Sequence, residues 1–195
     1  MDIEALIDSV QIFDLLIVLG LFGMFVLGFV QGVIRRLIGI GSIVFAFIVA
    51  AYLREPVGNW LGSNWTQFPA EYSRMLAFGL AFGTIAVGLA VVTQINYKTQ
   101  LLWPKTQFVE EIVGGLLGLV QGVILLLAIF VILETYFGGA PRPALDELPF
   151  LRSIYQAYDG SITADVYRTN VIPGFIALFG ILLPESVKSL LQFGG

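Results

Sequence analysis

The chain has 195 residues, of which 57% are hydrophobic and only 12% charged, and its formal net charge at pH 7 is −4. This charged fraction is about half that of an ordinary soluble domain, and the mean hydropathy is +0.89, so the composition predicts an integral membrane protein. The chain contains no cysteine and no histidine, which excludes thiol catalysis, disulfides and the common zinc and haem sites. We therefore expect no metal and no cofactor, and we assign no catalytic residue. The thinly spread acidic charge argues against nucleic acid as a partner.

Four apolar runs without a charged residue predict four transmembrane helices, since a helix needs about 20 apolar residues to cross the hydrocarbon core. The runs cover residues 15–34, 37–53, 75–95 and 112–133. They do not alternate polar and apolar residues as the strands of a membrane barrel do. We expect an all-α integral membrane protein with its transmembrane domain over residues 1–139 and the lipid bilayer as its surroundings.

The segments that flank the runs carry the charges and aromatic side chains. Residues 1–11 are acidic and amphipathic, which predicts a short interfacial helix or a frayed end. Arg35 and Arg36 separate the first two runs so closely that we expect a tight helical hairpin with this basic pair at its turn. Residues 57–74 are polar and aromatic, a composition typical of the headgroup layer, and predict an interfacial loop.

The tail, residues 140–195, is amphipathic. Pro149 suits a first helical turn, the helical pattern stops near Asp159, and Pro184 opens a last amphipathic helix. The apolar run of residues 171–183 is too short to span easily, so we expect it to lie in the interface or insert partway. A fifth membrane segment is the alternative.

A five-residue word occurs twice in the chain. Residues 30–34 and residues 120–124 both read Val-Gln-Gly-Val-Ile. Arg35 and Arg36 follow the first copy, whereas two leucines follow the second. We therefore expect the first copy to mark a membrane edge and the second to lie within a span.

Glycines spaced four apart make smooth helix faces on which two backbones can approach closely. The predicted packing positions are Gly28, Gly32, Gly79, Gly83, Gly114, Gly118 and Gly122. The last three recur every four residues in the fourth run and predict a groove for a second helix, from an identical or a different protein.

A few polar side chains lie within or beside the runs. They are Asp14, Gln31, Arg35, Arg36, Glu110 and Gln121. Gln121 lies next to Gly118 and Gly122 on a helix surface, so we expect its amide to face a neighbouring helix, where a hydrogen bond contributes about 0.6 to 2 kcal/mol. Gln31 and Gln121 either tie helices together or line a polar path for an ion or solute.

These motifs resemble the CvpA family, the colicin V production proteins, from about Phe13 to Leu133. The resemblance depends on an acidic residue before the first run, a basic glycine-rich turn, and an acidic residue that leads into spaced glycines; these are Asp14, then Gly32, Arg35 and Arg36, then Glu110, Gly114, Gly118 and Gly122. Gln31 and Gln121 stand where the family often has arginine, and Glu110 stands where it has aspartate. The resemblance implies a multi-pass bacterial inner-membrane protein linked to toxin production or export and to envelope upkeep, with no established catalytic activity.

Three functions remain open from the sequence. We favour a membrane scaffold or accessory subunit, whose glycine faces would build a homo-oligomer or join a larger complex. A small oligomeric channel or transporter would use the polar membrane positions as a path, and internal repeats are common in transporters. A membrane enzyme would act through Asp14, Glu110 or Glu134, although carboxylates at span ends are ordinarily just solvated.

The positive charges also suggest an orientation. The positive-inside rule favours a cytoplasmic side for the loops that carry Arg35 and Arg36 and Lys98 and Lys105. Arg54, Arg74, Arg142 and Arg152 give the opposite side the same number of basic residues. Only the compact basic turn and the acidic N-terminal segment therefore favour placing both termini on the periplasmic side.

Overall fold

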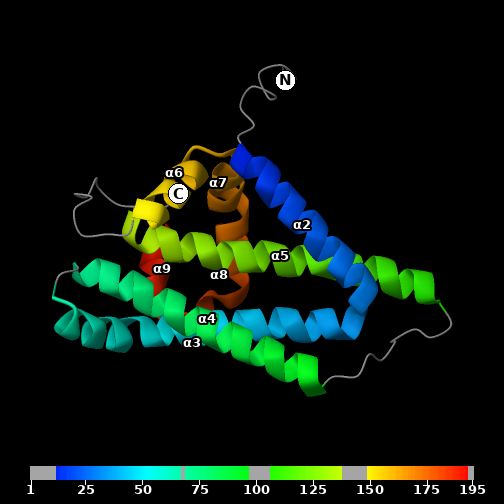
Figure 1. Cartoon of the computed structure of the whole chain (residues 1–195), viewed down its shortest axis with the longest axis horizontal. Coiled ribbons are helices and arrows are strands. Elements are labelled where there is room, and N and C mark those ends of the chain that lie inside the picture. The colour runs from blue at the N-terminus through cyan, green and yellow to red at the C-terminus, as the bar shows by residue number, and fades with distance from the viewer. Residues whose placement is uncertain (1–11, 67–68, 97–105, 138–148, 193–195) are drawn as a thin grey trace, which may run out of the picture.

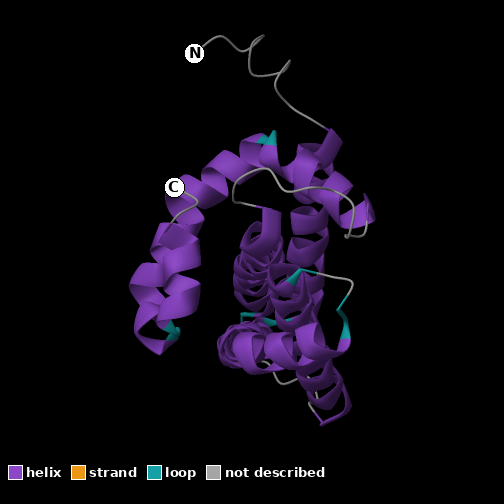
Figure 2. Ribbon diagram, turned by 90° about the vertical axis from the view of Figure 1, so that its left-hand side faces the viewer, coloured by secondary structure: helices purple, strands orange, loops and turns teal. Residues whose placement is uncertain are grey.

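The computed structural model describes residues 12–66, 69–96, 106–137 and 149–192. Helices joined by short loops account for this part of the chain (Figure 2), which confirms the expected all-α class. The amphipathic segment predicted for residues 1–11 lies outside the described residues.

Four helices are long and apolar enough to cross a membrane, as the four runs predict. They are α2 (Ile12–Gln31), α3 (Val33–Asn64), α4 (Ala70–Asn96) and α5 (Gln107–Phe137). Helices α3, α4 and α5 run alongside one another, whereas α2 is inclined to them and packs mainly on α5 (Figure 1).

The chain turns from α2 into α3 at Gly32, whose φ of 78° is the left-handed conformation that glycine adopts without strain. The sequence led us to expect Arg35 and Arg36 at the bend between the two helices. They lie instead in the first helical turn of α3, just after the bend at Gly32. The two helices also diverge from Gly32 instead of packing as a tight hairpin (Figure 1). The physical reason is that each finds a closer partner elsewhere, α2 on α5 and α3 on α4.

Helix α3 continues to Asn64, so most of the interfacial loop expected over residues 57–74 is helical. Pro56 lies inside α3, where a proline removes one backbone hydrogen bond and costs about 3 kcal/mol. The helix persists because its second half packs on α4. The approach there is close, since a methyl group on Gly58 would lie only 2.6 Å from Cγ of Arg74.

The tail folds into short helical segments. They are α6 (Pro149–Asp159), α7 (Ile162–Val166), a π-helical turn η2 (Tyr167–Val171), α8 (Ile172–Phe179), a 3₁₀ turn η3 (Gly180–Leu182) and α9 (Glu185–Gln192). Helices α7 and α8 run crosswise to α3, α4 and α5 (Figure 1). The location of this tail in the membrane interface, with residues 171–183 inserted or not, stays a prediction.

Aromatic side chains join the tail to the long helices. The ring of Phe47 on α3 lies 5.4 Å from that of Phe78 on α4 and 5.1 Å from that of Phe175 on α8. Phe130 on α5 stacks on Tyr158 of α6 at 4.2 Å. The long helices and the tail therefore share one apolar core.

Candidate functional site: an arginine-lined pocket

Helices α2 and α5 cross just before the two copies of the repeated word, at Met24 and Gly28 on α2 and Gly114 and Gly118 on α5. A methyl group on Gly28 would overlap the carbonyl oxygen of Gly114, and one on Gly118 would overlap the carbonyl oxygen of Met24. Substitution of Gly28 or Gly118 by any larger residue would therefore push the two backbones apart. The groove predicted on α5 is thus occupied by α2 of the same chain.

The contacts at this crossing are related by the repeat. The repeat relates positions that are 90 residues apart, so Gly28 corresponds to Gly118 and Met24 to Gly114. The contact of Gly28 with Gly114 therefore corresponds to the contact of Gly118 with Met24. The Gly28 methyl would also lie 3.0 Å from Cα of Gly118, and the Gly118 methyl 3.2 Å from Cα of Gly28. The crossing is therefore antiparallel with a local pseudo-two-fold axis.

The remaining predicted glycines differ in their surroundings. Gly32 lies beside Glu110, whose Oε1 would be 3.2 Å from an added methyl group, and a methyl on Gly122 would lie 2.9 Å from Cδ2 of Leu21. On α4, a methyl on Gly79 would meet Ile132 at 3.5 Å, and one on Gly83 would meet nothing within 4 Å. The α4 pair therefore lies on a much more open face than the α2–α5 glycines.

Glu110 links the start of α5 to the start of α3. Its side chain is fully buried, and Oε1 accepts a hydrogen bond of 3.0 Å from the backbone N–H of Val33. The first N–H groups of a helix have no partner within it and carry partial positive charge, so a carboxylate stabilises this end. Glu110 thereby holds the first turn of α3, which carries Arg35 and Arg36, against α5.

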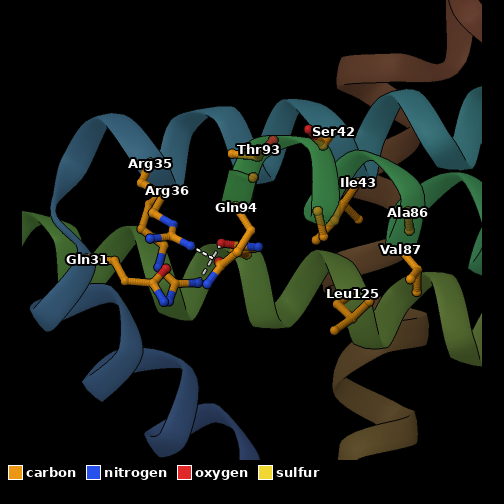
Figure 3. Close-up of a pocket in the computed structure, with 13 residues that line it drawn as sticks. Gln31, Arg35, Arg36, Ser42, Ile43, Ala86, Val87, Thr93, Gln94 and Leu125 are labelled. Carbon is orange, nitrogen blue, oxygen red and sulfur yellow. Dashed lines mark hydrogen bonds between the residues drawn. The ribbon is translucent and has the colours of Figure 1, made fainter. Parts of the chain in front are cut away.

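A cavity of about 310 Å³ opens between α3, α4 and α5 directly after this turn. We call it the arginine pocket (Figure 3). It is lined by Gln31, Arg35, Arg36, Gly39, Ser42, Ile43, Ala86, Val87, Ala90, Thr93, Gln94, Gln121 and Leu125. Four of the polar positions predicted from the sequence, the two arginines and the two repeat glutamines, therefore lie at one cavity.

Two hydrogen bonds cross the polar end of the pocket. Arg36 donates from Nη1 to Oε1 of Gln121 at 2.8 Å, and Arg35 donates from Nη2 to Oε1 of Gln94. The amide of Gln121 fits because position 39 is glycine, where a methyl group would lie 2.8 Å from Nε2 of Gln121. Gln121 therefore both ties α5 to α3 and lines the cavity, so the two interpretations of this residue are compatible.

The charged residues in the described lining of the pocket, Arg35 and Arg36, are both positive. Arg36 is 4% exposed, and its Nε has no hydrogen-bond partner in the part of the chain that the structure describes. The guanidinium of Arg35 is close enough to repel that of Arg36. None of the described residues that line the cavity is acidic. Guanidinium groups bind carboxylates and phosphates through paired N–H donors, so the chemistry of this lining suits an anion better than a cation.

The other two predicted carboxylates lie away from the pocket and hold the tail. Asp14 is 7% exposed, and its Oδ1 accepts hydrogen bonds from N and Oγ1 of Thr163 at 3.0 and 2.6 Å. Oε1 of Glu134 accepts from Tyr158 Oη at 3.1 Å and from Arg168 Nε at 2.8 Å. These contacts give both acids a structural role at the junction between the long helices and the tail.

The Glu134 contacts also shift the pKa values of two residues of the tail. Burial and the nearby negative charge of Glu134 raise the pKa of Tyr158 above its usual value. Burial alone would lower the pKa of Arg168, but its hydrogen bonds to Asp159 and Glu134 raise it. Tyr158 therefore stays neutral and Arg168 stays charged over the physiological range.

Three polar residues of the pocket, Ser42, Thr93 and Gln94, were not predicted from the sequence. A signal for the α4 side existed, because Ala86, Ala90 and Thr93 follow helical spacing and present small side chains on one face. A second basic pair, Arg54 and Arg74, was also not predicted as a site from the sequence. Both have a buried Nε without a hydrogen-bond partner among the described residues, and they lie at the opposite end of α3 and α4.

A family model described as Colicin V production protein matches residues 13–157. The chain belongs to this family. The match runs from α2 through most of α6, so every residue of the arginine pocket lies in the part of the chain that defines the family, whereas α7, α8 and α9 lie beyond it. In this member of the colicin V production family, Gln31 and Gln121 place amides at the pocket. Neither a search of the curated proteins nor a search of the solved structures found a match.

Proposed function

We propose that this family member binds an anionic solute in the arginine pocket and carries it through the membrane, in support of toxin production or export and of envelope upkeep. The observation that carries the proposal is the convergence of Arg35, Arg36, Gln94 and Gln121 on one cavity without an acidic residue among its described lining. The family described as Colicin V production protein gives the cellular setting.

The energetics of buried charge support an anionic ligand. A buried guanidinium that lacks a counter-ion is costly, because desolvation is not repaid by an opposite charge. A ligand anion at the polar end supplies that charge and gives the free Nε of Arg36 an acceptor. An anion bound at the polar end therefore offsets the desolvation cost of the buried Arg36 guanidinium.

The proposal involves no catalytic step. Asp14, Glu110 and Glu134 are the carboxylates that an enzyme would use, and each accepts a structural hydrogen bond from another helix or from the tail. The pocket residues bind and orient a ligand through charge and amide groups. We place the protein in the bacterial inner membrane, with the pocket end on the cytoplasmic side and both termini on the periplasmic side, as the positive-inside rule favours.

Flux measurements in proteoliposomes test this proposal. The probes are radiolabelled inorganic phosphate, glycerol phosphate and a fluorescent phosphatidic acid, each followed across a bilayer of phosphatidylcholine. We expect Arg35→Ala and Gln121→Leu to reduce the movement of at least one probe about tenfold or more, because each removes a hydrogen-bond partner at the pocket. Arg54→Gln serves as the control, since it alters a buried arginine outside the pocket. Unchanged flux in both pocket variants would overturn the proposal.

A scaffold or accessory role is the second candidate, and one observation favours it. Helix α2 packs against the glycine face of α5. Gly83 and Gly88 on α4, in contrast, have open space where a methyl group would lie. Leu80 and Val87 beside them are 58% and 63% exposed, so this face suits a helix of a second subunit. Native mass spectrometry of gently extracted protein tests the idea: Gly83→Leu should dissociate an assembly that Gly41→Leu on α3 leaves intact. An assembly that persists in both variants would count against this face.

A further inference from the structure

We infer that the ligand of the arginine pocket is a lipid phosphate, whose headgroup lies at the arginines and whose hydrocarbon chain leaves along α4. This inference rests on the proposed function and names its substrate class. It follows from three properties of the cavity: its two chemically different ends, its depth in the bundle, and the side on which it opens.

The pocket changes from polar to apolar along the helices. Arg35, Arg36 and Gln94 lie at one end, and Ile43, Val87 and Leu125 lie at the other (Figure 3). Arg36 and Ile43 are seven residues apart on α3, which corresponds to about 10 Å along a helix. A small hydrophilic anion would leave the apolar end empty, whereas a headgroup followed by methylene groups matches both ends.

The polar end lies at the depth of lipid headgroups. Arg36 and Arg54 are the buried arginines of α3, and their separation of eighteen positions corresponds to about 27 Å. This is close to the hydrocarbon thickness of a bilayer, about 30 Å. Arg36 therefore lies near one hydrocarbon boundary, where lipid phosphates lie, and basic pockets between membrane helices are known to bind such headgroups.

The cavity opens on the outer surface of the bundle. Its α4 side includes Val87, which is 63% exposed, together with the exposed Ala90 and Gln94. In a membrane this surface faces the acyl chains, so a lipid can enter sideways without crossing water. The volume of about 310 Å³ is at the lower limit of small-molecule pockets. It accommodates a phosphate and a short stretch of chain, and the rest of the chain lies against exposed Val91 and its neighbours on α4.

Native mass spectrometry of the full-length protein, titrated with defined lipids, tests the inference. The lipids are dioleoyl phosphatidic acid and dioleoyl phosphatidylcholine, which have the same chains, and inorganic phosphate is titrated in parallel by calorimetry. We expect phosphatidic acid to bind at least about tenfold more tightly than phosphatidylcholine and than inorganic phosphate, since only it offers both an unshielded phosphate and a chain. Equal binding of the two lipids would overturn the inference.

Three variants assign the binding to the pocket. Arg36→Gln should weaken phosphatidic acid binding about tenfold or more, and Arg54→Gln should leave it unchanged. Val87→Trp fills the apolar end from an exposed position, so it does not threaten folding; it should weaken the lipid severalfold without affecting inorganic phosphate. If Arg36→Gln fails to fold, Arg35→Gln replaces it, because Arg35 is less buried. Undiminished lipid binding in the arginine and Val87 variants would overturn the inference.

The outcomes separate this inference from the proposed function. If inorganic phosphate binds as tightly as phosphatidic acid, and both depend on Arg36, the pocket binds an anion but not specifically a lipid, so only the inference fails. If neither ligand depends on Arg35 or Arg36, the inference and the proposed function both fail.

Discussion

Arg36 donates a hydrogen bond of 2.8 Å to Gln121, and this bond joins α3 to the second copy of the repeated word on α5. The donor is 4% exposed, so bulk water has little access to it. The same pair borders the arginine pocket. The same contact therefore joins two helices and borders the proposed ligand site, so substitutions there should affect both stability and ligand binding.

Replacing Gln121 by leucine should lower the stability of the protein by about 1 to 3 kcal/mol, because a buried guanidinium loses its acceptor. Thermal unfolding in detergent measures the effect. Gln107→Leu, at an exposed position near the start of the same helix, should change the midpoint little. Equal midpoints for the two variants would show that the Arg36 bond adds nothing to stability.

Replacing Gly28 by alanine should destabilise the fold by about 1 to 3 kcal/mol, because the added methyl overlaps the carbonyl oxygen of Gly114 and forces α2 away from α5. Gly20→Ala is the matched control on the same helix, since nothing lies within 4 Å of its added methyl. Alanine favours a helix over glycine by about 1 kcal/mol, so this control should be neutral or slightly stabilising. The prediction fails if Gly28→Ala unfolds at or above the temperature of Gly20→Ala.

Replacing Glu110 by alanine should expose the start of α3 to hydrogen exchange, because the backbone N–H of Val33 loses its buried acceptor. Loss of such a cap costs about 1 to 2 kcal/mol, so local exchange should accelerate about tenfold. Exchange mass spectrometry resolves this segment. Glu110→Gln keeps an acceptor and should restore most of the protection, and Glu111→Ala should leave it intact. Protection that survives Glu110→Ala would contradict the cap.

Stability should fall as the pH rises above about 10, because burial raises the pKa of Tyr158 and of Tyr167 above that of an unfolded tyrosine. Between the unfolded and the folded pKa, only the unfolded chain releases these protons, so the folded state binds more protons and loses stability with pH. Below about pH 10 both states are protonated and the contribution is complete.

Unfolding midpoints at pH 8 and pH 11 check this sign. The double variant with Tyr158→Phe and Tyr167→Phe should lose less stability between the two values than the unmodified chain. Tyr52→Phe, at a residue that is 57% exposed, should not change the difference. A steeper loss in the double variant would contradict the assignment.

The sequence predicted the four long helices because length and apolar composition alone decide whether a segment can cross a membrane. It also placed the limits of α6 at Pro149 and Asp159, where local signals act. It failed after residue 53, where the apolar run ends and the sequence predicts a loop from residue 57, whereas α3 continues through Pro56 to Asn64. The packing of the second half of α3 on α4 outweighs that local preference.

The pocket was only half predictable for a related reason. Arg35, Arg36 and the repeat glutamines stood out as polar residues beside apolar runs. Gln94 contacts Arg35 from 59 positions along the chain, and this contact depends on the register of α4 against α3. That register is set by packing between distant residues, such as Phe47 with Phe78, which spacing along one helix does not reveal.

The two-fold relationship between α2 and α5 bears on sidedness. A helix that packs on an inverted copy of itself makes the same contacts whichever way it is inserted, so two separate chains in opposite orientations could form this crossing. When both copies belong to one chain, each has a fixed orientation in the membrane. The residues around one copy can then be substituted independently of those around the other. Arg35 and Arg36 follow one copy, and Leu125 and Leu126 follow the other. The difference in charge between the two copies thus arises from residues just outside a symmetric contact.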